Sequence, residues 1–286
     1  MADNRGPVVE SAVLRAELTR LRRDRNLTQE KVAKDLEWSP SKVIRIEGGR
    51  TPVSKVDLDA LLREYGATAA SDRLQELNKS ARLPRWWDAY KNEFDAEYLN
   101  FIGYEAGTSF IRQAALVVPG QLQTPEYAAA LTLGRLEPDR VKAIVDLRMQ
   151  RQLELAQREQ PPQQYYAMDE AVIRRHIGIR TNRAIMPNQL RSIADRAEAD
   201  ALLTVRIIPF DEGEHAGLLG AFSLLEFAES LPDVLYLDPG RGTIILEQDP
   251  EQVSEYRDDF ESLLDHALTP EESIELIRAV ADEMSK

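Results

Sequence analysis

The chain has 286 residues, of which 43% are hydrophobic and 30% are charged, and its formal net charge is -13. This length and composition are typical of a protein with two globular domains. The absence of cysteine excludes disulfides, thiolate metal sites and cysteine nucleophiles, and only three histidines are present. The sequence contains no apolar run long enough for a membrane helix and no recognisable signal peptide, so we expect a cytoplasmic protein.

The charge is distributed unevenly along the chain. Residues 5–50 carry eleven Lys and Arg against seven Asp and Glu, a local charge of +4, which leaves -17 for the remainder. An acidic protein repels DNA unless its positive charge is gathered in one region. The sequence therefore predicts a small basic module that precedes a large acidic one.

The basic module has the pattern of a bundle of short helices. Thr28 is a candidate N-cap for the second helix, and Ser39 is one for the third, where Pro40 takes the first helical position. Asn26 and Leu27 break the pattern after the first helix, Gly48 and Gly49 end the third helix, and Gly66 ends the fourth. We expect helices at 11–25, 29–36, 40–47 and 55–66.

The second and third of these helices, joined by a short turn, predict a helix-turn-helix, in which the second member enters the major groove. Ala33 is small where the two helices cross, and Val43 and Ile46 form the inner face of the third helix. The outward positions of that helix are Ser41, Lys42 and Arg45. The alternative interpretation is a solvated basic face that binds nothing.

The segment LTQEKVAKDLEWSPSKVIRIEGGR, residues 27–50, resembles the XRE-type, or phage-repressor-like, helix-turn-helix regulators. The resemblance implies that Gln29 lies at a helix N-terminus beside a phosphate. The segment departs from the family at Glu37, because the family usually has glycine at this position of the turn, so we expect a strained turn. The residues expected to contact DNA are Gln29, Ser39, Pro40, Ser41, Lys42, Arg45 and Arg50.

Within this set, the resemblance places Pro40, Ser41 and Arg45 at positions that usually face base edges. Pro40 has no side-chain donor, so it is limited to a thymine methyl group or to DNA shape. Arg45 is the best candidate for a bidentate guanine contact.

The remainder of the chain predicts a helical connector over 67–93 and an acidic α+β domain over 94–286, after a helix-turn-helix domain over 1–66. Helices are expected at 94–115, 125–133, 140–158, 188–199, 250–267 and 270–284. Strands are expected at 164–168, 203–208, 222–227, 234–237 and 243–246.

The acidic domain contains no convincing catalytic set. Residues 209–217 place carboxylates around His215, but they favour a loop over a metal or acid–base site. Residues 239–242 favour a hairpin turn over a phosphate loop. Three arginines at 148, 151 and 158 favour a solvated helix face over a second nucleic-acid site, because glutamates lie among them. We therefore expect no enzymatic activity, no cofactor and no metal site.

A second resemblance covers this domain. The segment EAGTSFIRQAALVVPGQLQTPEYAAAL at 105–131, followed in order by LRMQRQ, MDEAVIRR, LTVRIIPFDEGEHAG, FSLLEF and ALTPEESIELI, resembles the C-terminal domain of an actinobacterial family of antitoxin-like transcriptional regulators. The resemblance implies a regulator that is often encoded beside a small partner protein.

Together these features favour a sequence-specific DNA-binding transcriptional regulator, a homodimer on an inverted-repeat operator in double-stranded DNA. Its C-terminal domain would receive a small partner protein, encoded by an adjacent gene, or a ligand. The alternative is an antitoxin-like protein whose main role is to sequester that partner, with autoregulatory DNA binding. An enzyme fused to a helix-turn-helix is disfavoured by the cysteine and histidine counts.

Overall fold

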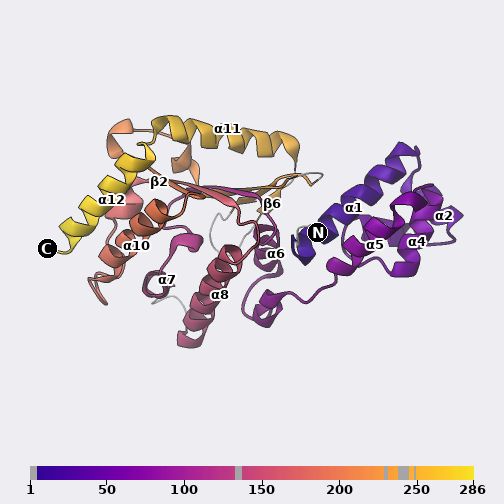
Figure 1. Cartoon of the computed structure of the whole chain (residues 1–286), viewed down its shortest axis with the longest axis horizontal. Coiled ribbons are helices and arrows are strands. Elements are labelled where there is room, and N and C mark those ends of the chain that lie inside the picture. The colour runs from indigo at the N-terminus through magenta and orange to yellow at the C-terminus, as the bar shows by residue number, and fades with distance from the viewer. Residues whose placement is uncertain (1–4, 133–136, 229–230, 238–244, 248) are drawn as a thin grey trace. The chain divides into compact units, whose positions relative to one another are not determined.

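A computed structural model describes residues 5–132, 137–228, 231–237, 245–247 and 249–286. The chain divides into two compact units, which are Met1–Trp86 with Phe227–Leu231, and Trp87–Glu226 with Pro232–Lys286. The N-terminal region is helical, and the C-terminal region combines helices with a mixed β-sheet (Figure 1), which confirms the predicted fold class. Among the described residues, no helix has the length and apolarity that a membrane span requires.

The first unit is built from short helices at the positions that the sequence predicted. They are α1 (Pro7–Asp24), α2 (Gln29–Asp35), α3 (Pro40–Glu47), α4 (Lys55–Glu64) and α5 (Ser71–Ser80). The ends of α3 agree with the prediction, whereas α1 starts four residues earlier than Ser11, at a proline that suits the first turn of a helix.

The core of the first unit draws on each of these helices. Its buried side chains are Leu14, Leu18, Val32, Ala33, Val43, Ile46, Val53, Leu58, Leu61, Leu62, Tyr65 and Leu74. The last of these belongs to α5, which packs against α1 and α4 and lies within the range 67–93. A fragment that ended at Gly66 would therefore lose part of this core.

The second unit contains the remaining helices and the strands. The helices are α6 (Ala96–Glu105), α7 (Pro125–Thr132), α8 (Pro138–Ala156), α9 (Glu170–Arg174), α10 (Ile185–Ala199), α11 (Pro250–His266) and α12 (Pro270–Met284). The strands are β1 (Phe110–Ala115), β2 (Gln163–Asp169), β3 (Leu203–Ile208), β4 (Phe222–Glu226), β5 (Val234–Leu237) and β6 (Ile245–Glu247). The predicted turn at 239–242 and the start of the predicted strand at 243–246 lie outside the described residues.

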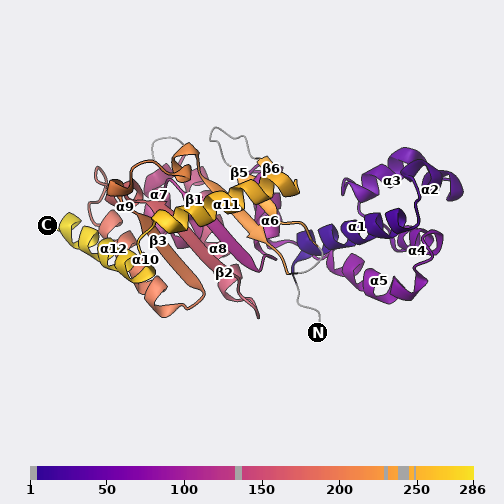
Figure 2. The same cartoon turned by 90° about the horizontal axis from the view of Figure 1, so that it is seen from above.

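One predicted element of this unit is wrong. The segment 94–115 is not a single helix, because α6 ends at Glu105 and β1 begins at Phe110. Strand β1 pairs with a strand along each edge, and helices lie on both faces of the sheet (Figures 1 and 2), so its side chains lack the polar–apolar alternation of a half-exposed strand. Pairing with distant strands therefore outweighs the local helical preference of its alanine, arginine and glutamine residues.

The sheet has the strand order β3-β2-β1-β4-β5-β6. Strands β1, β2 and β3 run parallel, and β4, β5 and β6 continue the sheet antiparallel. Helix α11 covers one face, while α6, α7, α8 and α10 lie on the other (Figures 1 and 2). The central strand β1 is thus the place where the parallel half meets the antiparallel half.

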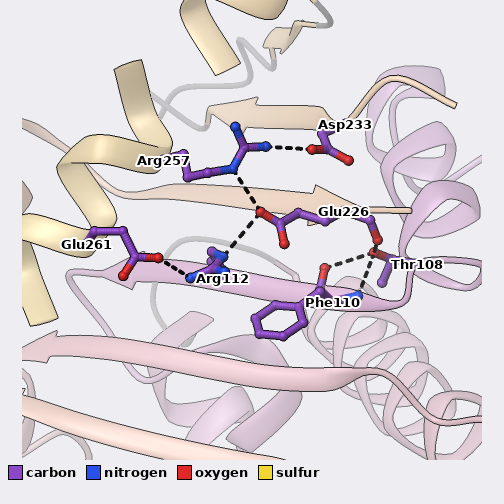
Figure 3. A network of polar contacts seen from close by, with 7 residues as sticks. All are labelled: Thr108, Phe110, Arg112, Glu226, Asp233, Arg257 and Glu261. Carbon is purple, nitrogen blue, oxygen red and sulfur yellow. Dashed lines mark hydrogen bonds and ion pairs between the residues drawn. The ribbon is translucent and has the colours of Figure 1, made fainter. Parts of the chain in front are cut away.

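A polar network fastens α11 to its face of the sheet (Figure 3). Glu226 of β4 lies 3.2 Å from Arg112 of β1 and 3.1 Å from Arg257 of α11. Arg112 also reaches Glu261 at 2.6 Å, and Arg257 reaches Asp233 at 2.5 Å. Both arginines of this network therefore have carboxylate partners.

Candidate functional site

The helix-turn-helix is formed by α2 and α3 and the turn between them. The Thr28 hydroxyl accepts a hydrogen bond from the Lys31 amide at 3.1 Å, which confirms it as the N-cap of α2. Ser39 occupies the N-cap position of α3, but its hydroxyl lies 3.1 Å from that of Ser41 and makes no capping bond. Pro40 takes the first helical position, as predicted.

The turn between these helices contains a residue in the left-handed region. Glu37 has a φ of 56°, which confirms that its position favours glycine. For a side chain with a Cβ atom this conformation costs about 1–2 kcal/mol. The hydrogen bond from the Trp38 amide to the Ala33 carbonyl, at 2.7 Å, holds the turn closed over this residue.

A buried ion pair joins three helices of the first unit. The Arg22 guanidinium of α1 donates two hydrogen bonds to the Glu47 carboxylate of α3, at 2.7 and 2.9 Å. The Gln29 side chain of α2 donates a third to the same carboxylate, at 2.8 Å. The Gln29 amide group, which the sequence placed beside a phosphate, thus helps to fix α2 against the end of α3.

The exposed face of α3 carries Ser41, Ile44 and Arg45, which recur at the spacing of one helix face. Arg45 is exposed and forms no side-chain hydrogen bond or ion pair with any described residue, so its guanidinium is available to a ligand. Ile44 is 45% exposed. The sequence prediction left Ile44 out, although its spacing from Ser41 and Arg45 was sufficient to place it on this face.

Lys42 is positioned differently from Arg45. Its ammonium lies 2.6 Å from the Asp57 carboxylate of α4 and 3.7 Å from the centre of the Trp38 ring. It is half-buried between them, so it does not share the outward face with Ser41. Arg50 is exposed in the turn after α3, where its amide donates to the Arg45 carbonyl at 2.9 Å.

Arg148 and Arg151 of α8, and Arg158 just after it, do not form the solvated face that the sequence predicted. Arg151 is buried and donates to the Glu105 carboxylate of α6 at 2.9 and 2.7 Å, and to the Tyr98 hydroxyl at 2.7 Å. Arg158 donates to the Thr108 carbonyl at 2.5 Å. That prediction is wrong because the acidic partner of Arg151 lies on another helix, 46 residues away.

The acidic segment 209–217 is a loop with short 3-10 turns between β3 and β4, as predicted. His215 Nε2 lies 3.1 Å from a carboxylate oxygen of Asp169. Over the described residues, histidine and acidic side chains form no group of three or more that could hold a metal ion.

Two family models match separate parts of the chain. Residues 13–74 match a Helix-turn-helix domain, and residues 98–279 match a Domain of unknown function (DUF5753). No curated protein and no solved structure matches the chain. The first match identifies a helix-turn-helix protein, and this domain makes the chain a DNA-binding regulator in general terms.

Proposed function

We propose that this chain, which belongs to the family of the Domain of unknown function (DUF5753), is a sequence-specific DNA-binding transcriptional regulator of the XRE type. The observation that carries the proposal is the exposed face of α3. That face presents an arginine that has no side-chain partner among the described residues, beside a hydroxyl and an aliphatic side chain. Its helix is anchored by the buried pair between Arg22 and Glu47.

Each side chain of this face suits a different feature of the major groove. The Arg45 guanidinium matches the two acceptors of guanine, O6 and N7, in a bidentate contact. Ile44 offers an apolar surface to the methyl group of thymine, and the Ser41 hydroxyl can donate or accept at either base edge. A recognition helix of this kind discriminates bases, while Ser39 and Arg50 near its two ends would contact phosphates.

The remaining parts of the proposal concern assembly and control. One recognition helix covers only a few base pairs, so we infer a homodimer on an inverted repeat, with its interface in the second unit. The second unit is acidic and would be repelled by DNA, which suits a role in assembly and regulation rather than in DNA contact. A small partner protein or ligand would act through this unit.

The test begins by selecting DNA fragments from a random pool with the full-length protein and titrating the preferred operator and its single-base variants. We expect Arg45→Ala to reduce discrimination at one base pair of each half-site by about 1–3 kcal/mol, because the bidentate contact is lost. Arg63→Ala, which removes an exposed arginine of α4, is the matched control and should preserve the preference. An unchanged ranking of operator variants with Arg45→Ala would contradict the proposal.

A further inference from the structure

A cavity of about 750 Å3 lies in the second unit at the carboxyl end of β1. Its walls come from α6, the segment that follows β1, α8, and the residues that lead into β4. Ligands of α/β sheets bind outside the carboxyl ends of parallel strands, at the point where the strand arrangement changes. Strand β1 occupies that point here, and the cavity is in the size range of sites for small organic molecules.

The apolar part of the cavity is aromatic. The rings of Tyr98 and Phe101 are stacked with centroids 6.2 Å apart, and Phe101 stacks on Tyr236 at 4.0 Å. The lining also includes two exposed aliphatic side chains, Leu116 and Leu219, which are 49% and 92% exposed. These surfaces favour a ligand with a flat apolar body, because such a body would remove them from water.

Two buried polar atoms of the lining have no hydrogen-bond partner among the described residues, Glu93 Oε2 and Gln121 Nε2. Gln121 is only 4% exposed, and its Nε2 atom is buried without a hydrogen-bond acceptor among the described residues. Its backbone is held in place by a hydrogen bond of 2.8 Å from Arg196 to the Gln121 carbonyl. A buried amide donor left unsatisfied costs about 1–3 kcal/mol, so this atom marks a position for an acceptor on a ligand.

A cation of the lining is also incompletely paired. Arg148 of α8 donates a hydrogen bond of 2.8 Å to the Gln123 side chain and a further one to the Tyr98 hydroxyl, but it forms no ion pair within the described part of the chain. The nearby carboxylate of Glu105 is occupied by Arg151. Burial lowers the pKa of Arg148, which is the effect of desolvating a charge that has no anionic partner. A guanidinium has five N–H donors, so most of its capacity remains for a ligand.

The other acidic side chains of the lining do not supply that partner. Asp95 is the N-cap of α6, and Glu93 lies just before it with its Oε2 atom buried and unpartnered. Neither forms an ion pair with Arg148 within the described residues. Among the described residues, the cavity therefore combines a cation that has no ion-pair partner and an amide donor that has no acceptor with an aromatic wall.

We propose that this cavity binds a small carboxylic acid with an aromatic body. Its carboxylate accepts hydrogen bonds from Arg148 and from the Gln121 amide, and its body lies against Tyr98, Phe101 and Tyr236. The proposed function places the control of DNA binding in the second unit, and the cavity assignment says which kind of ligand exerts it. The assignment rests on the proposed function only in expecting that the ligand changes DNA binding.

The experiment compares two probes of nearly equal shape, naphthalene-1-acetate and its neutral amide naphthalene-1-acetamide, by calorimetric titration of the full chain without DNA. We expect the acid to bind at least tenfold more tightly than the amide, because only the acid neutralises the half-buried guanidinium of Arg148. Absence of binding by the acid, or equal affinity for both probes, overturns the proposal.

Two variants separate the roles of the polar groups. Arg148→Met should lower the affinity for the acid about tenfold and leave the amide within about twofold. Gln121→Leu should weaken both probes by a similar factor, because each has an oxygen that accepts from this amide. Lys142→Met, which changes an exposed residue of the same helix, is the control and should alter neither affinity. The assignment is overturned if Lys142→Met loses the preference for the acid over the amide, or if Arg148→Met keeps that preference.

Titrating the operator with and without the acid then distinguishes the two proposals. Binding of the acid to a protein that selects no DNA refutes the proposed function and leaves the cavity assignment standing. Selective DNA binding by a protein that does not bind the acid refutes the cavity assignment alone.

Discussion

Helix α3 of the first unit and helix α8 of the second both carry arginines among other polar residues, so the sequence alone does not distinguish their roles. In α3, Arg45 faces solvent and has no side-chain partner within the described part of the chain, while Arg22 of α1 neutralises the carboxylate of Glu47 at the end of α3. In α8, Arg151 is buried against a carboxylate, and Arg148 lines a cavity. In each unit, a cation fully paired with a buried carboxylate holds the structure, and a second cation without an ion-pair partner among the described residues is available to a ligand.

The comparison shows that burial and partners decide the role of a cation. An exposed arginine on a convex helix face suits a large ligand with accessible acceptors, such as the edge of a base pair. A half-buried arginine with spare donors, such as Arg148, suits a small anion that fits the cavity around it. The following predictions test the distinction between paired and unpaired cations.

The largest effect is expected from breaking a buried pair. Arg151→Met leaves the Glu105 carboxylate buried without its cation, which should lower the free energy of unfolding of the second unit by about 3–5 kcal/mol. Arg22→Met should do the same to the first unit through Glu47. Calorimetry of the full chain, with the transitions of the two units followed separately, measures both losses.

The control is Lys142→Met, which breaks the exposed ion pair with Asp146 on α8 and should cost less than about 1 kcal/mol. If Arg151→Met unfolded at the same temperature as this control, the buried pair would have no structural role and the comparison would fail.

A smaller effect is expected at Lys42. Lys42→Met removes its contacts with the Asp57 carboxylate and the Trp38 ring, and should destabilise the first unit by about 1 kcal/mol without changing the preference among operator variants. Burial raises the pKa of Asp57, but the hydrogen bonds from Lys42 and Ser54 outweigh burial and lower it overall.

This lowered pKa gives the Lys42 prediction a pH dependence. The stabilisation is present above the pKa of Asp57 in the unfolded chain and is lost as the pH falls through the lower value of the folded state. Denaturation of the parent and of Lys42→Met should therefore show a difference in the free energy of unfolding at neutral pH. This difference should shrink at pH values below both the folded and the unfolded pKa of Asp57. A difference that is constant with pH would show that the carboxylate does not carry the effect.

The fold of the first unit could be predicted from the sequence because its signals are local. Caps, a proline at the start of α3, and apolar residues at helical spacing specify each helix within a few residues of its position. The strands from β2 onward were also found, since runs of β-branched and aromatic residues mark them. Strand β1 was missed, because its identity depends on pairing with β2 and β4, which follow much later in the chain.

The candidate sites also divide into residues that local spacing could place and residues whose partners lie far away in the sequence. Ser41 and Arg45 could be placed on an exposed face from helical spacing alone. The pairing of Gln29 with Glu47 and of Lys42 with Asp57 could not, since these partners lie on other helices. Arg148 became recognisable only when α6, α8 and the segment after β1 came together around a cavity.

The smallest effect is expected in the turn that holds α3 in place. Glu37→Gly removes the cost of a left-handed conformation, about 1–2 kcal/mol, but adds about 0.5–1 kcal/mol of backbone entropy in the unfolded chain. The first unit should therefore gain about 0.5 kcal/mol, while Glu37→Ala keeps the strained conformation and serves as the control for loss of the carboxylate. Thermal unfolding measures the gain. Because the exposed face of α3 is unchanged, both variants should rank operator variants as the parent does, and destabilisation by Glu37→Gly would show that the glutamate side chain stabilises this turn.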